Sequence, residues 1–305
     1  MSELTRLAKE LFAYERSKMR LDGWFLAKEI ECALEEKYKD CGEELKKAYL
    51  LQEVVKSIPL ELSAYHVFAG TQDDAFARSY ALINPSFKVE EFSGYCDPTA
   101  VFNDIEPNEE FSSTRIDSVR EQVKQSAYVR DLSAVYEKIE TYTQEVVFFV
   151  EQVTGHLIPD FRYALKHGLD NMIADLEGKS GNGYKAMKIS LEAVILLADR
   201  YLALAKSMPE TPQLKSMIAT LENVPRRGAT SLQGAIQMFI LLWQVMCVEQ
   251  TPNPFAFSVG NADRIFEPYR NGLSREETAD LLKHFLVFFN ESAVSSKCSY
   301  QRARY

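Results

Sequence analysis

Apolar and polar residues follow a helical period over most of this chain. Apolar positions recur at spacings of three and four, which is the pattern of one buried helix face. This periodicity predicts helices over residues 24–57, 113–153, 161–176, 184–206, 212–222, 232–249 and 274–290. The chain is therefore predicted to be mainly α.

Local signals place several of these helices more closely. Thr211 followed by Pro212 is typical of an N-cap and a first-turn proline, and Ser274 followed by Glu277 forms a capping-box pattern. Gly178 is the expected stop of the helix that begins at residue 161. Residues 232–249 are apolar on nearly every side, which predicts a helix inside the core.

The periodicity changes between residues 58 and 111. Prolines and glycines separate short extended pieces there, such as LELSAYHVF at 60–68 and FKVEEF at 87–92. Such runs favour a few β-strands within the mainly α chain. Residues 292–305 lose all periodicity. We therefore expect one domain over residues 1–291 and an irregular tail over 292–305.

Composition narrows the class of protein. The 305 residues are 46% hydrophobic and 26% charged, as in ordinary globular proteins. The net charge of -9 argues against non-specific nucleic-acid binding, which needs a basic face. The N-terminus lacks the apolar core of a signal peptide, and the longest apolar run, 238–248, is too short to span a membrane. We expect a cytoplasmic protein that binds neither nucleic acid nor membrane.

The titratable metal-ligand residues form no recognisable site. The five cysteines are odd in number and have no CxxC spacing, which favours reduced thiols over disulfides or zinc. His66, His167 and His284 have no metal-ligand spacing and are interpreted as structural or exposed residues. GNGYKA at 181–186 fits a loose dinucleotide pattern, but it follows a helix instead of a strand. It is interpreted as a turn between helices.

Four segments, in order along the chain, resemble the glycyl radical enzymes, the pyruvate formate-lyase superfamily. They are IPLELSAYHVFAG at 58–70, TGHLIPDF at 154–161, PRRGATSLQGAIQ at 225–237 and GNADRIFEPY at 260–269. They are similar to the family patterns "pi-x-I … l-x-G", "GH-x-IPD-aromatic", "P-x-x-PA-x-sf-x-EALQ" and "GR-x-DQ-x-LYPYY". The chain departs from these patterns at Gly234, where glutamate is usual, at Asn261 for arginine and at Arg264 for glutamine.

The resemblance implies the N-terminal portion of a ten-stranded α/β barrel and its helical shell. Full-length members of the family are more than twice as long as this chain. Two loops meet at the barrel centre in those members. One carries a glycine that an iron–sulfur activase converts to a radical with S-adenosylmethionine, and the other carries a cysteine that becomes a thiyl radical.

Neither radical loop is recognised in this sequence. CVEQ at 247–250 imitates the family's cysteine loop, "CVEP", but alignment places it at an ordinary helix end. EFSGY at 91–95 imitates the glycine loop, "RV-x-GY", but it lacks the arginine and lies in the first third of the chain. We therefore predict no catalytic residue, no metal and no cofactor in this chain.

His156 is the one site residue that the resemblance implies. It matches the histidine of the "GH-x-IPD" segment, which lines the substrate pocket in several members, and is predicted to bind substrate. The alternative is a histidine that hydrogen-bonds locally and fixes the turn before Pro159. Sequence alone leaves both open.

The leading hypothesis is a truncated glycyl radical enzyme homologue that is not catalytic on its own. A second hypothesis is one half of a split lyase or dehydratase, completed by a C-terminal partner chain that supplies both loops. A third is a non-catalytic binding or scaffold protein that keeps the helical shell, because function lies in the site and not in the scaffold. The sequence also leaves open a homo-oligomer and the identity of any substrate.

Overall fold

The computed structural model describes residues 2–16, 24–70, 112–125, 134, 138, 158–249 and 259–294. Its helices are α1 (Glu3–Arg16), α2 (Trp24–Leu34), α3 (Glu43–Ser57), α6 (Ser113–Lys124), α8 (Phe161–His167), α9 (Leu169–Ala174), α10 (Asn182–Ser207), α11 (Pro212–Leu221), α12 (Leu232–Glu249), α13 (Ala262–Phe266) and α14 (Arg275–Val294). Short 3₁₀ turns, η1 (Glu35–Tyr38) and η3 (Glu267–Tyr269), follow α2 and α13. The prediction of a mainly helical chain is confirmed, and these ranges contain no β-strand.

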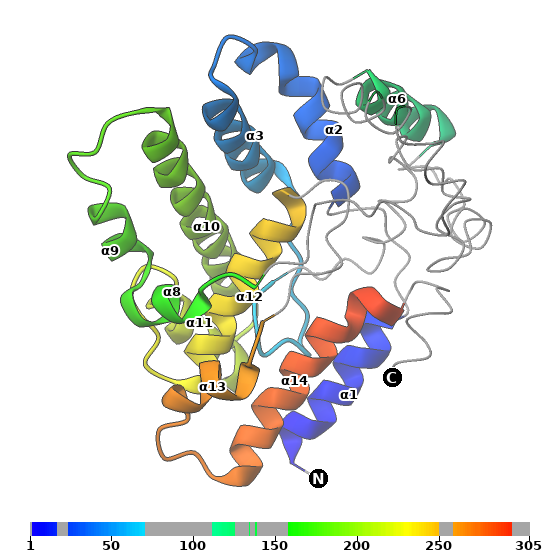
Figure 1. Cartoon of the computed structure of the whole chain (residues 1–305). Helices are drawn as coiled ribbons and strands as arrows, with labels where there is room; N and C mark the ends of the chain where they lie inside the picture. Colours follow the sequence, from blue (N-terminus) through cyan, green and yellow to red (C-terminus); the bar gives the residue numbers. More distant parts are fainter. Residues whose placement is uncertain are drawn as a thin grey trace.

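Helix α12 lies in the middle of the assembly, between α10 and α14 (Figure 1). It also contacts α2, α3, α8, α11 and α13. Six of its side chains are completely buried: Ala235, Ile236, Met238, Phe239, Ile240 and Leu241. This confirms the prediction of a core helix. Within the described ranges, no helix is both long and apolar enough to cross a membrane.

Four phenylalanines join α12 to the helices around it. The Phe239 ring of α12 meets Phe161 of α8 edge-on, with 4.7 Å between ring centroids. It also meets Phe266 at 6.0 Å and Phe285 at 5.6 Å. Edge-to-face pairs at these separations stabilise beyond the area that they bury. The cluster fixes α8, α13 and α14 against one central ring.

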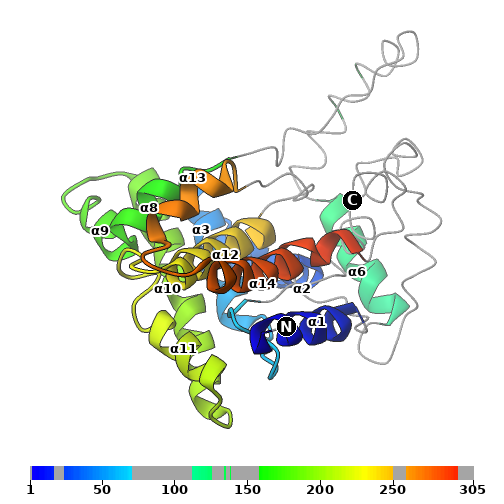
Figure 2. The ribbon, with the colours of Figure 1, turned by 90° about the horizontal axis from the view of Figure 1, so that it is seen from below.

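The α1 helix lies beside α14, so the first residues of the chain meet its last described helix (Figures 1 and 2). Asp280 of α14 is 4% exposed. Its carboxylate accepts hydrogen bonds from the Ser2 hydroxyl, from the Thr5 hydroxyl at 2.5 Å and from Lys283 Nζ at 3.0 Å. One turn later, His284 Nε2 is 2.7 Å from the carbonyl oxygen of Leu4. This set of contacts is called the α1–α14 clasp below.

Both predicted helix starts are confirmed. The Thr211 hydroxyl accepts a hydrogen bond from the Leu214 amide at 3.1 Å, and α11 begins at the next residue after Thr211, Pro212. At α14, the Ser274 amide donates to Glu277 Oε2 at 2.8 Å, and the Glu277 amide donates to Ser274 Oγ at 3.2 Å. These reciprocal bonds satisfy amides that a helix start leaves unpaired.

Two helices that the periodicity predicts as continuous are broken in the structure. Residues 24–57 form α2 and α3, separated by η1 and a turn that ends at Gly42. Residues 161–176 form α8 and α9, separated by Gly168 at φ 77°. A Cβ at Gly168 would lie 2.4 Å from the carbonyl oxygen of Arg226. The break occurs there because a distant loop packs directly on this backbone, which the apolar period does not report.

The strand prediction for LELSAYHVF is wrong. Residues 60–68 form turns and irregular backbone. Helix side chains bond the residues that flank this segment, Ile58 and Ala69. The buried Gln237 amide pairs with both backbone groups of Ala69, each at 2.7 Å. Arg200 Nη2 donates to the carbonyl of Ile58 at 2.8 Å. The other predicted strand, FKVEEF, lies outside the described residues.

Candidate functional site

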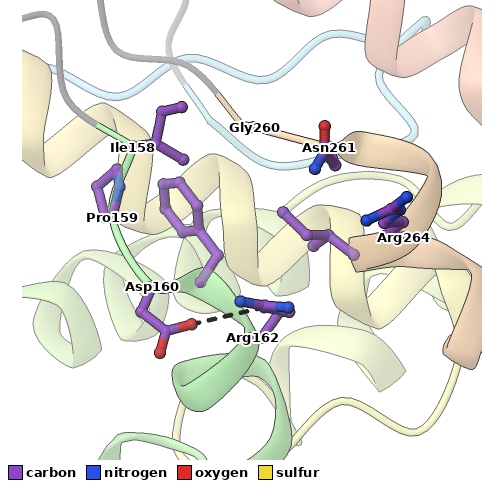
Figure 3. Close-up of a pocket in the computed structure, with 9 residues that line it drawn as sticks. Ile158, Pro159, Asp160, Arg162, Gly260, Asn261 and Arg264 are labelled. Carbon is purple, nitrogen blue, oxygen red and sulfur yellow. Dashed lines mark ion pairs between the residues drawn. The ribbon is translucent and has the colours of Figure 1, made fainter.

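Two segments that are about 100 residues apart in the sequence line an open pocket of about 610 Å³ (Figure 3). One segment precedes and begins α8, and the other leads into α13. Both belong to the segments that resemble glycyl radical enzymes. The described residues that line the pocket are Ile158, Pro159, Asp160, Phe161, Arg162, Gly260, Asn261, Arg264 and Ile265.

The close approach of the two segments depends on Gly260. Its φ of 77° lies in the left-handed region that favours glycine. A Cβ there would come within 2.8 Å of Ile158 Cγ2. Local bonds fix each side, because the Phe161 amide donates to Pro159 O at 2.8 Å and the Ala262 amide donates to Gly260 O at 2.9 Å.

The pocket has an apolar floor and a charged rim. Phe161 and Ile265 are 2% and 7% exposed and form part of the core. Arg162 Nε lies 3.8 Å from Asp160 Oδ1, and both side chains are largely exposed. Within the described part of the chain, Arg264 has no carboxylate within ion-pair distance. The rim therefore holds two guanidinium groups against one carboxylate.

The other two family-like segments attach to this region through backbone contacts. The Ala229 amide donates to Leu165 O at 2.8 Å, and the Leu169 amide donates to Pro225 O at 2.8 Å. A Cβ at Gly228 would lie 2.3 Å from Lys166 O, so the backbones of these two segments touch without intervening side chains. Since Gln237 also holds Ala69, all four segments pack into one framework around α12.

The residues singled out from the sequence fall in different places. His156 lies outside the described residues, so its contact with substrate stays a prediction, and EFSGY at 91–95 also lies outside them. Cys247 is in the last turn of α12, which confirms that CVEQ begins on an ordinary helix end. Gly181 is the N-cap of α10 and follows α9 through a turn, as predicted, but the other residues of GNGYKA, 182–186, belong to α10 itself.

Sequence reasoning missed the polar features that depend on tertiary contacts. His66 and His284 are buried, as a structural interpretation requires. Burial lowers the pKa of His284, because the charged imidazolium is poorly solvated in the core. Of the two pocket arginines, Arg264 was noted only as a departure from the family pattern, and Arg162 was not singled out. In the described part of the chain, no group of three or more His, Cys, Asp or Glu residues has a metal-binding arrangement.

Solved structures define the class of this fold. Hydroxyproline dehydratase from Clostridioides difficile superposes with a TM-score of 0.70 at 18% identity, over 93% of this chain and 40% of that one. A protein of 1,2-propanediol dehydration from Roseburia inulinivorans gives 0.68 at 19% identity, over 97% and 41%. A glycyl radical enzyme from Archaeoglobus fulgidus gives 0.70 at 17% identity, over 95% and 40%. The fold of this chain is therefore similar to about two-fifths of each of these structures, one of which is a glycyl radical enzyme.

The family follows from the sequence itself. The profile of the family described as "Pyruvate formate lyase-like" matches residues 2–303, so the chain belongs to that family. No individual curated protein matches it. The chain spans about two-fifths of the length of the similar structures.

Proposed function

We propose that this chain supplies the N-terminal part of a glycyl radical enzyme fold and does not perform radical catalysis by itself. The observation that carries the proposal is the asymmetry of coverage: 93–97% of this chain matches 40–41% of two dehydration-related proteins. The part of the barrel that includes both radical loops would then come from elsewhere. Its β-strands would build the α/β barrel, and the helices of this chain would then lie around that barrel.

The position of Cys247 supports this view. Radical transfer in the family uses a cysteine on a loop that meets the glycine loop at the barrel centre. Cys247 is in regular helix within α12, whose backbone bonds fix its position along the helix axis. It is therefore a poor candidate for the thiyl radical, and the sequence offers no second cysteine in a family-like loop.

The test is anaerobic activation of the purified chain. The protein is incubated with S-adenosylmethionine and an iron–sulfur activase of the family, and then assayed by electron paramagnetic resonance and by turnover. Trans-4-hydroxy-L-proline, propane-1,2-diol, glycerol, and pyruvate with coenzyme A are the substrates. We expect no glycyl radical signal and no product. A signal, or turnover of any of these compounds, would refute the proposal.

A partner-completed enzyme is the second candidate. The partial coverage of the similar structures favours it, since this chain matches only 40–41% of the length of those proteins. A cytoplasmic C-terminal chain with both radical loops would supply the remainder, and His156 would then contact the substrate that the completed barrel encloses.

Co-expression distinguishes the two candidates. This chain is produced with a tagged C-terminal three-fifths of the Clostridioides difficile or Roseburia inulinivorans protein. A stable complex that yields a glycyl radical after activation would support the split enzyme. Failure of both fragments to associate, with this chain folded and monodisperse, would favour a binding or scaffold role. Ligand binding that is lost in His156→Ala would support that third reading.

A further inference from the structure

The pocket between residues 158–162 and 260–265 has the size and floor of a small-molecule site. Its volume of about 610 Å³ lies within the range of about 300–1,000 Å³ that ligand pockets occupy. The Phe161 ring is held from behind by Phe239, at 4.7 Å between centroids. The apolar floor is therefore rigid before any ligand arrives, which lowers the entropy cost of binding.

The rim has an excess of positive charge in an acidic protein. Asp160 is the one acidic residue among the described lining residues, and its 3.8 Å distance to Arg162 is too long for a hydrogen bond. Arg162 therefore keeps its donors available, and Arg264 forms no described ion pair. Guanidinium groups bind carboxylates through two parallel hydrogen bonds.

Two of the positions where the sequence departs from the family pattern lie on one wall of this pocket. Where the family pattern has arginine and then glutamine, this chain has Asn261 and Arg264, and both side chains line the pocket. The amide and the guanidinium have exchanged places at a spacing of three residues, close to one helical turn. This wall thus still has one arginine, but its positive charge lies at position 264, next to Ile265, instead of at position 261.

We propose that this pocket binds a small organic acid. Its carboxylate would lie between Arg162 and Arg264, and its apolar body would lie on Phe161 and Ile265. The floor argues against inorganic phosphate, which has no apolar part to bury, and Asp160 would repel a dianion more strongly than a monoanion. The proposal requires neither a partner chain nor radical chemistry.

The test compares ligands that differ only in charge. Hexanoate, hexanamide and inorganic phosphate are titrated against the full chain, and dissociation constants are obtained from saturation-transfer NMR. We expect hexanoate to bind at least about tenfold more tightly than hexanamide, since two guanidiniums contact its charge. Equal affinities for hexanoate and hexanamide, tighter binding of phosphate, or no binding of hexanoate would overturn the proposal.

Variants then locate the bound acid. Arg162→Gln and Arg264→Gln are each expected to weaken hexanoate binding by about three- to fivefold, as for exposed ion pairs. Arg270→Gln is the matched control, because Arg270 is similarly exposed, pairs with Glu267 and does not line the pocket. An Arg270→Gln effect as large as that of Arg264→Gln would show that hexanoate binds elsewhere and overturn the assignment.

Discussion

The packing around α12 and the α1–α14 clasp hold distant parts of the chain together by different means. Around α12, completely buried aliphatic and aromatic side chains join α2, α3, α8, α10, α11, α13 and α14. In the clasp, one carboxylate and one imidazole bond the first turn of α1. The first contact is large and non-directional, whereas the second depends on a few oriented polar groups.

The apolar packing around α12 stabilises the whole fold, whereas the polar clasp positions only the N-terminal helix α1. Apolar burial contributes about 25 cal/mol per Å² and does not depend on charge state. A hydrogen bond to a charged group contributes about 1.5–3 kcal/mol and changes when that group titrates. Damage to α12 should therefore unfold the whole protein, whereas damage to the clasp should release α1 locally.

Phe239→Ala tests the apolar side of this comparison and should have the largest effect. The ring is completely buried and contacts three other phenylalanines, so its loss leaves a cavity. We expect the free energy of unfolding, measured by urea denaturation, to fall by about 3–5 kcal/mol. Met187→Ala, at a side chain that is 55% exposed on α10, should change it by less than about 0.5 kcal/mol. Similar losses in both variants would contradict the role of α12 as the core.

Gly168→Ala tests the backbone contact that brings two family-like segments together. The new methyl group would meet Arg226 O at 2.4 Å while φ stays at 77°. We expect a loss of about 2–4 kcal/mol, from backbone strain plus displacement of the 225–229 loop. The control is Gly178→Ala, which has a φ of 76° but open space around it, and should cost only about 1 kcal/mol. Equal costs would show that φ, and not the contact, requires glycine.

The contact between Gly168 and Arg226 also shows which features the sequence alone does not predict. The capping box at Ser274, the N-cap at Thr211 and the apolar α12 were predictable because each depends on neighbours within a turn or two. The break at Gly168 depends on a loop some sixty residues away, so the apolar period runs through it unchanged. The 60–68 segment was predicted as an extended piece, but Arg200 and Gln237 hold the residues on either side of it, Ile58 and Ala69, and no local pattern indicates these contacts.

The residues of the candidate site were also only partly predictable from the sequence. Resemblance identified the segments that contain Pro159 and Gly260, but it could not predict that they line one pocket. Arg162 was not singled out, and Arg264 was noted only as a departure from the family pattern. His156, the one residue predicted to bind substrate, remains untested by the described structure.

Asp280→Ala tests the polar side of the comparison. Hydrogen bonds from Ser2, Thr5 and Lys283 lower the pKa of Asp280 to about 2, so the carboxylate stabilises the fold when ionised. We expect a loss of about 2 kcal/mol at pH 7, with faster amide exchange in α1 and little change in α12. In the native protein this contribution should be present above pH 4 and decline as pH falls toward 2. Uniformly faster exchange in α1 and α12 would contradict a local clasp.

The histidine of the clasp should give the smallest effect, in a different pH range. Burial lowers the pKa of His284, so the unfolded chain takes up its proton more readily than the folded one. Stability from this group is therefore full above about pH 6.5 and is lost as the pH falls below that value. We expect a decrease of about 1 kcal/mol between pH 7.5 and 5.5, measured by urea denaturation, and a smaller decrease in His284→Gln. An unchanged pH dependence of the unfolding free energy in His284→Gln would show that the clasp does not sense pH through His284.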